Sequence, residues 1–318
     1  MTIISSDISK AADLLTNGKI VAIPTETVYG LAGSIYNEQA IKKIFATKQR
    51  PLFNPLIVHL YDIEQVKAIV SDFPPKAQLL AQHFWPGPLT LILKKKPTVP
   101  DLITAGKDTV AVRIPNHPVT LQLLKKLPFP IAAPSANPFN RISPTRATHV
   151  EAYFKDTIPM VLEGGECKKG IESTIIGFEN DEIKVYRLGS LALEEIEKVV
   201  GKVKLKNKAE AAPNAPGMLA KHYAPKTKTI LTDNIEKSLS EYEQLAVGIL
   251  KFRGNRQMNR TVHVEVLSET GDLAEAAANL YHSLHKLDDL RLDIIIAERF
   301  PNYGLGKTIN DRLGRATK

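Results

Sequence analysis

Cysteine and long apolar runs are both scarce in this chain of 318 residues. Cys167 is the only cysteine, so an internal disulfide is excluded and a reduced, cytoplasmic setting is expected. No stretch approaches the roughly 18 consecutive apolar residues that cross a bilayer, so no membrane partner is expected. The first ten residues also lack the basic start and the apolar run of a secretory signal.

Length and charge set the next limits. A chain of 318 residues exceeds what a single core usually organises, so two domains are expected. The net charge is +8 and the pI is about 9.3, which suggests anionic partners such as nucleotides or RNA. The alternative is a surface that is merely basic, because the lysines are scattered and arginines do not alternate with aromatic residues.

Short apolar segments alternate with helical patterns over residues 18–199. Asn37 is expected to cap a helix, because apolar residues then recur at helical spacing. The helix predicted at 74–85 is expected to begin at its prolines, Pro74 and Pro75. The predicted strands are 18–24, 56–60, 89–93, 109–114 and 130–133, with a hairpin of 173–178 and 182–187; the further predicted helices are 74–85 and 193–200.

The composition changes at residues 201–217, which are lysine-rich, contain two prolines and are typical of a linker. Beyond them, strand and helix patterns alternate again, which predicts a small parallel α/β sheet. The expected fold is thus α/β, with a first α/β domain in 1–204, a linker or lid in 205–228, and a smaller Rossmann-like domain in 229–318. Its predicted strands are 229–231, 245–250, 262–267 and 292–297, and its helices are 235–242, 271–287 and 306–315.

Two strand-associated segments carry candidate binding groups. I-P-T-E-T-V-Y-G-L (23–31) follows a strand and gathers hydroxyls and a carboxylate in a turn, where α/β folds place ligand sites; a simple Thr/Gly turn is the alternative. In T-V-A-V-R-I-P (109–115), alternation puts Thr109 and Arg113 on one face. An arginine within a strand requires a partner, either a protein carboxylate or an anionic ligand.

Other polar segments add cations, hydroxyls and amides. In K-Q-R-P-L-F-N-P-L-I-V-H (48–59), Lys48 offers a point charge to phosphates and Arg50 a bidentate guanidinium. The alternative is that both cations interact with the dipole at the C-terminal end of a helix. The proline-stiffened A-P-S-A-N-P-F-N-R-I-S-P-T (133–145) offers donors to phosphate oxygens. G-I-E-S-T-I-I (170–176) opens a strand, and A-P-G-M-L-A-K-H-Y-A-P (215–225) contains residues unusual for a spacer.

Together, in this order, these segments resemble the YrdC-type threonylcarbamoyl-adenylate synthases in their long, two-domain form. The resemblance covers essentially the whole chain and implies an open, twisted α/β sheet for the first domain, 1–204. It implies that L-threonine, bicarbonate or CO2, and ATP form threonylcarbamoyl-AMP and pyrophosphate, and that a separate transferase complex modifies the adenosine beside a tRNA anticodon. It also implies Mg2+ held mainly by phosphates and water, with no metal ligand from the protein, and possible contact with tRNA or RNA.

The resemblance further assigns site residues. His59 is also the candidate general base, and residues 213–225 are expected to act as a lid. Around threonine it implies Thr27, His59, Arg113, Ala133 and Ser173; around ATP it implies Lys48, Arg50, Asn54, Thr109, Ser135, Ser143, Arg187 and Tyr223.

Three features of the chain suggest other functions. A non-catalytic double-stranded-RNA binder would also use a basic surface, but no standard RNA-binding signature is present. G-L-G-K-T (304–308) suggests a P-loop, yet position 301 is proline where that motif needs glycine. His282 and His285 share a helix face without a nearby cysteine, which favours a solvated edge over a zinc site.

Overall fold

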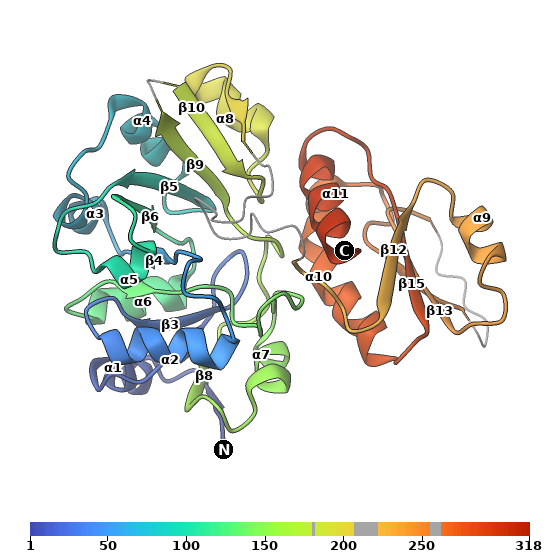
Figure 1. The fold of residues 1–318 in the computed structure, drawn as a ribbon, viewed down its shortest axis with the longest axis horizontal. Coiled ribbons are helices and arrows are strands. Elements are labelled where there is room, and N and C mark those ends of the chain that lie inside the picture. Colours follow the sequence, from blue (N-terminus) through green and yellow to red (C-terminus); the bar gives the residue numbers. More distant parts are fainter. Residues whose placement is uncertain (180–181, 207–221, 255–261) are drawn as a thin grey trace.

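The computed structural model describes residues 1–179, 182–206, 222–254 and 262–318. The chain forms two lobes of unequal size, each built around its own sheet (Figure 1). The larger lobe contains the N-terminus. In the smaller lobe, two helices, α10 (Leu273–Asp289) and α11 (Leu305–Ala316), lie on the side that faces the larger lobe (Figure 1).

The sheet of the larger lobe has 11 strands in the described residues and mixes parallel with antiparallel neighbours. Their spatial order is β1-β8-β2-β3-β7-β4-β6-β5-β9-β10-β11. The strands are β1 (Ile3–Ser5), β2 (Val21–Ile23), β3 (Gly30–Ser34), β4 (Ile57–His59), β5 (Leu89–Lys94), β6 (Thr109–Arg113), β7 (Ile131–Ala132), β8 (Met160–Leu162), β9 (Thr174–Glu179), β10 (Glu182–Arg187) and β11 (Lys204–Leu205).

The helices of this lobe begin where the sequence offers a cap or a proline. Asn37 accepts a hydrogen bond from the Ala40 amide at 2.9 Å, and Pro75 occupies the first turn of its helix. The helices are α1 (Ile8–Thr16), α2 (Glu38–Lys48), α3 (Ile63–Ile69), α4 (Pro75–Phe84), α5 (Asp101–Thr104), α6 (Pro118–Lys126), α7 (Ala147–Phe154) and α8 (Leu193–Val200).

Strand alternation gives the large sheet two different faces. One face is buried in the main core; its central strands contribute Val58, Leu91, Val112 and Ile176. On the other face, α1 and α6 pack over β2, β7 and β8. Beyond those helices, the same face of β4, β5, β6 and β9 carries the apolar residues Ile57, Ile92, Ala111 and Ile175. His59 follows Ile57 on this face of β4, and Arg113 follows Ala111 on this face of β6. The candidate site lies on this second face.

The smaller sheet is parallel throughout its described strands, in the order β12-β15-β13-β14. This arrangement confirms the predicted small α/β domain. Its strands are β12 (Lys228–Thr232), β13 (Val247–Lys251), β14 (Val262–Val266) and β15 (Ile294–Glu298), and α9 (Ile235–Ser240) joins α10 and α11 as its helices.

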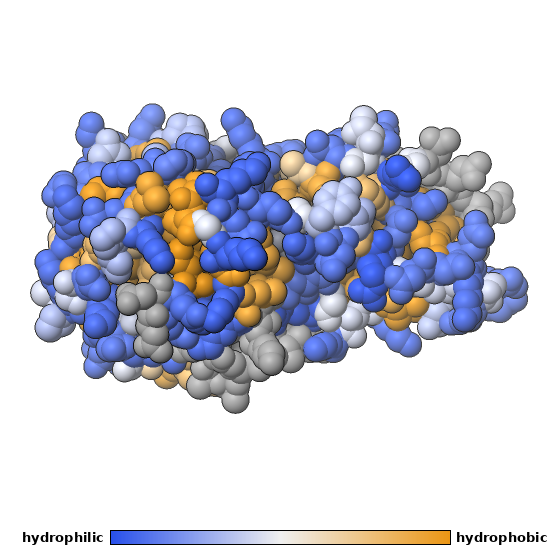
Figure 2. Space-filling view, turned by 90° about the horizontal axis from the view of Figure 1, so that it is seen from above, coloured by the Kyte–Doolittle hydropathy of each residue, from blue (hydrophilic) through white to orange (hydrophobic). Residues whose placement is uncertain are grey.

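The molecular surface seen from above is mainly hydrophilic, with an apolar area on the larger lobe (Figure 2). Within the described ranges, no helix is both long and apolar enough to span a bilayer.

Candidate active site

One cavity lies on the second face of the large sheet, where loops from distant parts of the chain meet. It encloses about 50 Å³, well below the roughly 300 Å³ of an ordinary ligand pocket. The end of the linker forms part of its wall, which accounts for part of the small volume. The lining residues are Thr25, Thr27, Val28, Gly30, Arg50, Ile57, His59, Arg113, Ala133, Pro134, Ser135, Glu172, Ser173, Arg187, His222 and Tyr223.

Arg113 ends β6 and is held on several sides. Its Nη2 lies 2.7 Å from Glu26 Oε1, its Nη1 donates to Thr27 Oγ1 at 3.0 Å, and its Nε donates to the Gly87 carbonyl at 3.2 Å. Thr27 is in turn bonded to Thr25, with 2.8 Å between the two hydroxyl oxygens. The first sequence segment and the arginine strand therefore form one buried unit at the cavity.

His59 enters the cavity from β4, next to Arg113 in strand register. Burial and the positive charge of Arg113 lower the pKa of His59 to about 3. The imidazole is therefore neutral at pH 7. This low pKa makes His59 a weak proton acceptor, and its role as general base stays a prediction.

Two further arginines lie at the cavity. Arg50 follows α2 and donates from Nη2 to the Pro55 carbonyl at 2.9 Å; burial and then the charge of Arg187 lower its pKa to about 9. Arg187 ends β10 and donates to the Ser173 carbonyl at 2.7 Å and to Ser173 Oγ at 3.0 Å. Cationic groups crowded together in a buried place favour an anionic ligand.

Lys48 and Asn54 are buried but do not line the cavity. The Lys48 ammonium donates to the carbonyls of Ser135 and Asn137, so Lys48 fixes the loop that brings Ser135 to the cavity. Both amide atoms of Asn54 are buried without a hydrogen-bond partner in the described structure. An unsatisfied buried amide is costly, so Asn54 suits contact with a ligand.

Two further residues expected at the nucleotide, Ser143 and Thr109, also lie away from the cavity lining. Ser143 is directed to Glu172, donating to Oε1 at 2.6 Å. Thr109 shares a face with Arg113 as predicted, but it lies four residues along β6 and lines a separate depression beside Tyr186. The apolar side chains of Ile57, Ala111 and Ile175 lie on the sheet face between these places.

The linker segment reaches the cavity through His222 and Tyr223, which are both buried. The Ala224 amide donates to the Asn140 carbonyl at 2.8 Å, which attaches this end of the linker to the larger lobe. The Tyr223 hydroxyl and the His222 Nδ1 have no hydrogen-bond partner in the described structure. Residues 213–221 of the expected lid lie outside the described residues.

Sequence reasoning missed several groups at the site. Glu26, Glu172 and His222 lay within the selected segments but received no role, and Arg312 lay within a helix of the small domain. Glu26 and Glu172 were detectable as carboxylates between small polar residues. No local signal marks Arg312, because its partners are distant in the sequence.

Two other sequence expectations concern the C-terminal lobe. The G-L-G-K-T segment forms the start of α11, where Lys307 pairs with Glu194 at 2.8 Å. The prediction that His282 and His285 form a solvated edge was wrong for His285, which is buried and stacks on His149 with ring centroids 4.0 Å apart. The helix packs against the larger lobe, which periodicity alone could not reveal. No group of three or more metal-ligating residues occurs in the parts of the chain described.

Comparison with known proteins agrees with this description. A family model described as "Telomere recombination" matches residues 13–189, and one described as "Threonylcarbamoyl-AMP synthase, C-terminal domain" matches residues 191–317. Fold, site and these matches define a two-domain α/β enzyme with a cavity lined by three arginines. The chain belongs to the threonylcarbamoyl-AMP synthase family, which confirms the resemblance in the sequence and favours an enzyme over a non-catalytic RNA binder.

Individual relatives match over nearly their full length. The threonylcarbamoyl-AMP synthase of Pyrococcus abyssi is 39% identical over 315 residues, covering 96% of this chain and 93% of its own. That of Bacillus subtilis is 39% identical over 319 residues, covering 97% and 92%. The crystal structure of P. abyssi Sua5 complexed with L-threonine superposes with a TM-score of 0.92 at 38% identity, covering 99% of this chain and 98% of that one.

Proposed function

We propose that this protein condenses L-threonine, bicarbonate or CO2, and ATP into threonylcarbamoyl-AMP and pyrophosphate, for modification of the adenosine beside the anticodon of tRNA. The observation that carries the proposal is the convergence of three buried arginines, Arg50, Arg113 and Arg187, on one cavity. A substrate with a carboxylate and a nucleotide with three phosphates together supply the anions that such a cavity favours.

Threonine is proposed to bind beside Arg113. Arg113 still has N–H groups to offer a carboxylate beyond its ion pair with Glu26 and its hydrogen bonds to Thr27 and Gly87. The other proposed threonine contacts are Thr27, His59, Ala133 and Ser173, all of which line the cavity. The crystal structure of P. abyssi Sua5 complexed with L-threonine supports threonine as the ligand.

ATP is proposed to bind on the side of Arg50 and Arg187. Ser135 and Tyr223 line the same cavity, and the unsatisfied Tyr223 hydroxyl suits a ligand contact. Asn54 contributes through its unsatisfied amide, whereas Lys48 and Ser143 act by holding neighbouring groups. Thr109 lies at the separate depression, so its contact with ATP requires the nucleotide to extend across the face. Admission of ATP requires movement of His222 and Tyr223, as expected of a lid.

The chemistry requires positioning more than a protein nucleophile. The neutral threonine amine attacks CO2, either free or released from bicarbonate with loss of hydroxide, to form a carbamate and gives up a proton to water. A carbamate oxygen then bonds to the α-phosphorus of ATP while the bond to pyrophosphate breaks, and pyrophosphate leaves. The arginines neutralise the charge carried by the phosphates during this displacement. His59 stays the candidate general base, although its low pKa makes it a weak proton acceptor.

Mg2+ is proposed to enter with ATP. The two carboxylates nearest the site, Glu26 and Glu172, are each paired with an arginine. Phosphate and water oxygens would therefore supply most of its ligands, as Mg2+ commonly accepts at triphosphate sites. The ion would supply charge neutralisation on the phosphates.

We further propose that the adenylate passes to a threonylcarbamoyl transferase complex in the cytoplasm. The test of the reaction is pyrophosphate release from protein, ATP, Mg2+ and bicarbonate, with and without threonine. Threonine-dependent release is expected. Release that is equal without threonine, or absent altogether from the folded protein, would contradict the proposal.

A further inference from the structure

A carboxylate lies at the wall of the proposed anion site, where a negative charge is unfavourable. Glu172 directly precedes Ser173, lines the cavity and is only 6% exposed. A buried carboxylate that faces bound phosphates would repel them unless another group neutralises it. The groups around Glu172 therefore matter for any anion that enters the cavity.

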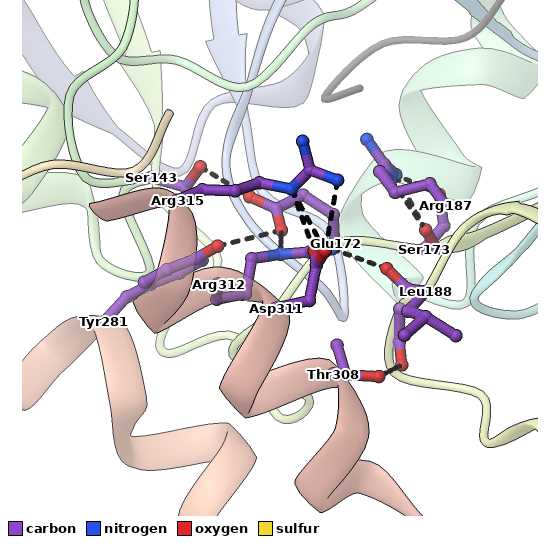
Figure 3. Close-up of polar contacts among 11 residues, drawn as sticks. Ser143, Glu172, Ser173, Arg187, Leu188, Tyr281, Thr308, Asp311, Arg312 and Arg315 are labelled. Atoms are coloured by element: carbon purple, nitrogen blue, oxygen red, sulfur yellow. Dashed lines mark hydrogen bonds and ion pairs between the residues drawn. The ribbon is translucent and has the colours of Figure 1, made fainter. Parts of the chain in front are cut away.

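Most of that neutralisation comes from the other lobe (Figure 3). Arg312 of α11 donates from Nε to Glu172 Oε2 at 2.9 Å, and the Tyr281 hydroxyl of α10 donates to the same oxygen at 3.0 Å. Ser143 of the larger lobe occupies the other oxygen. The carboxylate thus has hydrogen bonds on both of its oxygens, and it forms an ion pair with Arg312.

Arg312 is itself a buried residue, 1% exposed, with further contacts near the site. Its Nη2 donates to the carbonyl of Leu188 at 2.6 Å, and its guanidinium lies 4.7 Å from the ring centroid of Tyr223. Leu188 directly follows Arg187, and Tyr223 lines the cavity. One side chain of the small lobe therefore contacts three segments that form the cavity wall.

The charge state of Glu172 agrees with this geometry. Burial by itself raises the pKa of this carboxyl, but the charges of Arg312 and Arg187 and the hydrogen bond from Ser143 outweigh burial, so the pKa is lowered. Glu172 is consequently an anion at neutral pH. If Arg312 were removed, the negative charge of Glu172 would be only partly compensated at the edge of the cavity.

We propose that Arg312 is a positioning residue of the active site, through which the C-terminal lobe neutralises Glu172 so that the cavity accepts ATP. The small lobe is then a part of the site. The inference rests on the proposed function for the identity of the nucleotide. It goes beyond that function by giving the C-terminal lobe a defined task at the site.

Other contacts between the lobes provide a comparison. Thr308 of α11 donates to the Gly189 carbonyl at 3.0 Å, one turn before Arg312. Neither Thr308 nor Gly189 lines the cavity. If the C-terminal lobe only needs to adhere, loss of the Thr308 bond and loss of Arg312 should have similar effects on ligand binding; if Arg312 neutralises Glu172, the two losses should differ.

The test uses the full chain and four variants: Arg312→Met, Glu172→Gln, the double variant, and Thr308→Val as the matched control. ATP and threonine binding are measured separately by calorimetry, and thermal unfolding reports folding. We expect Arg312→Met to weaken ATP binding about tenfold or more, with threonine binding changed less than about threefold. In the double variant, most of the lost ATP affinity should return, because both charges are gone. Thr308→Val should bind ATP as the original chain does.

Three outcomes would overturn the proposal: ATP binding unchanged in a folded Arg312→Met variant, ATP affinity no better in the double variant than in Arg312→Met, or an equal loss in Thr308→Val. If Arg312→Met does not fold, ATP binding by Arg312→Lys and by the double variant replaces it. ATP binding about tenfold weaker in the double variant overturns the proposal. ATP binding close to that of the original chain in both variants supports the proposal. Because binding is measured directly, this test of Arg312 does not depend on the reaction. A chain that binds ATP but releases no threonine-dependent pyrophosphate contradicts the proposed function and leaves the role of Arg312 in ATP binding intact.

Discussion

Arg113 and Glu26 form an ion pair of 2.7 Å at the base of the cavity, and both side chains are buried. The strand pattern left two possibilities for Arg113, a protein carboxylate or an anionic ligand. The structure provides the first while keeping the guanidinium at the cavity wall. Removing Arg113 therefore has two consequences, because it deletes a proposed substrate contact and leaves a buried carboxylate unpaired.

Arg113→Lys should separate these consequences, because lysine keeps the charge beside Glu26 but loses the fork that suits a carboxylate. A charge-assisted hydrogen bond contributes about 1.5–3 kcal/mol, so KM for threonine should rise about tenfold or more. KM for ATP should change little. Steady-state kinetics with each substrate varied in turn measures both constants, and equal weakening of the two would rule out the assignment of Arg113 to threonine.

Arg50→Ala should chiefly impair ATP use. Arg50 lies at the cavity beside Arg187, and loss of one phosphate contact should raise KM for ATP and slow turnover about tenfold or more. Lys43→Ala is the matched control, because Lys43 is an exposed cation on the preceding helix. Unchanged ATP kinetics in folded Arg50→Ala would instead reduce Arg50 to a residue that only holds the turn at Pro55.

Lys48→Met should lower stability as well as ATP use. The Lys48 ammonium is the donor to the carbonyls of Ser135 and Asn137, and each buried acceptor left without its donor costs about 1–3 kcal/mol. Thermal or denaturant unfolding should therefore show a loss of about 2 kcal/mol or more. A variant that keeps its stability yet loses ATP binding would show that Lys48 contacts phosphate directly.

Mild acid should weaken the interface between the lobes. Burial lowers the pKa of His149, on α7, to about 2 and that of His285, on α10, to about 4. In the unfolded chain both titrate near 6.5. The unfolded state therefore takes up protons first, so stability is complete above about pH 6.5 and is lost progressively as the pH falls toward 4. Thermal unfolding at pH 7, 6 and 5 measures this loss.

His149→Phe keeps a ring in the stack and removes one titrating group. Its unfolding midpoint should fall less between pH 7 and pH 5 than that of the original chain. His83→Asn serves as the control, because His83 is exposed. An identical pH dependence in all three proteins would exclude the histidine stack as a source of acid sensitivity.

Much of the fold was predictable because local signals agreed with the final packing. Helix α2 follows from Asn37 and its apolar stripe, and strand β6 follows from its alternating pattern. Strands β1 and β8 were missed, because each has only three residues and they pair with each other across about 150 residues of sequence. The segment expected to be a linker from residue 201 also contains β11, whose edge pairing with β10 no local pattern reveals.

The candidate site was predictable to the extent that its residues lie in compact segments. Thr27, Arg113 and Ser173 were selected from such segments and meet at the cavity. The exceptions have a physical reason: Thr109 shares the predicted face with Arg113, but a strand of that length separates its two ends by more than a side chain spans. The pairing of Arg312 with Glu172 depends on how two lobes pack, which strand and helix periodicity do not encode.

The most direct test of the central claim is the mass of the product formed from ATP, 13C-labelled bicarbonate and 15N-labelled threonine with Mg2+. The account predicts an adenylate that carries both labels and accumulates in step with pyrophosphate until it hydrolyses. Pyrophosphate or ADP that forms without a doubly labelled adenylate would contradict the account.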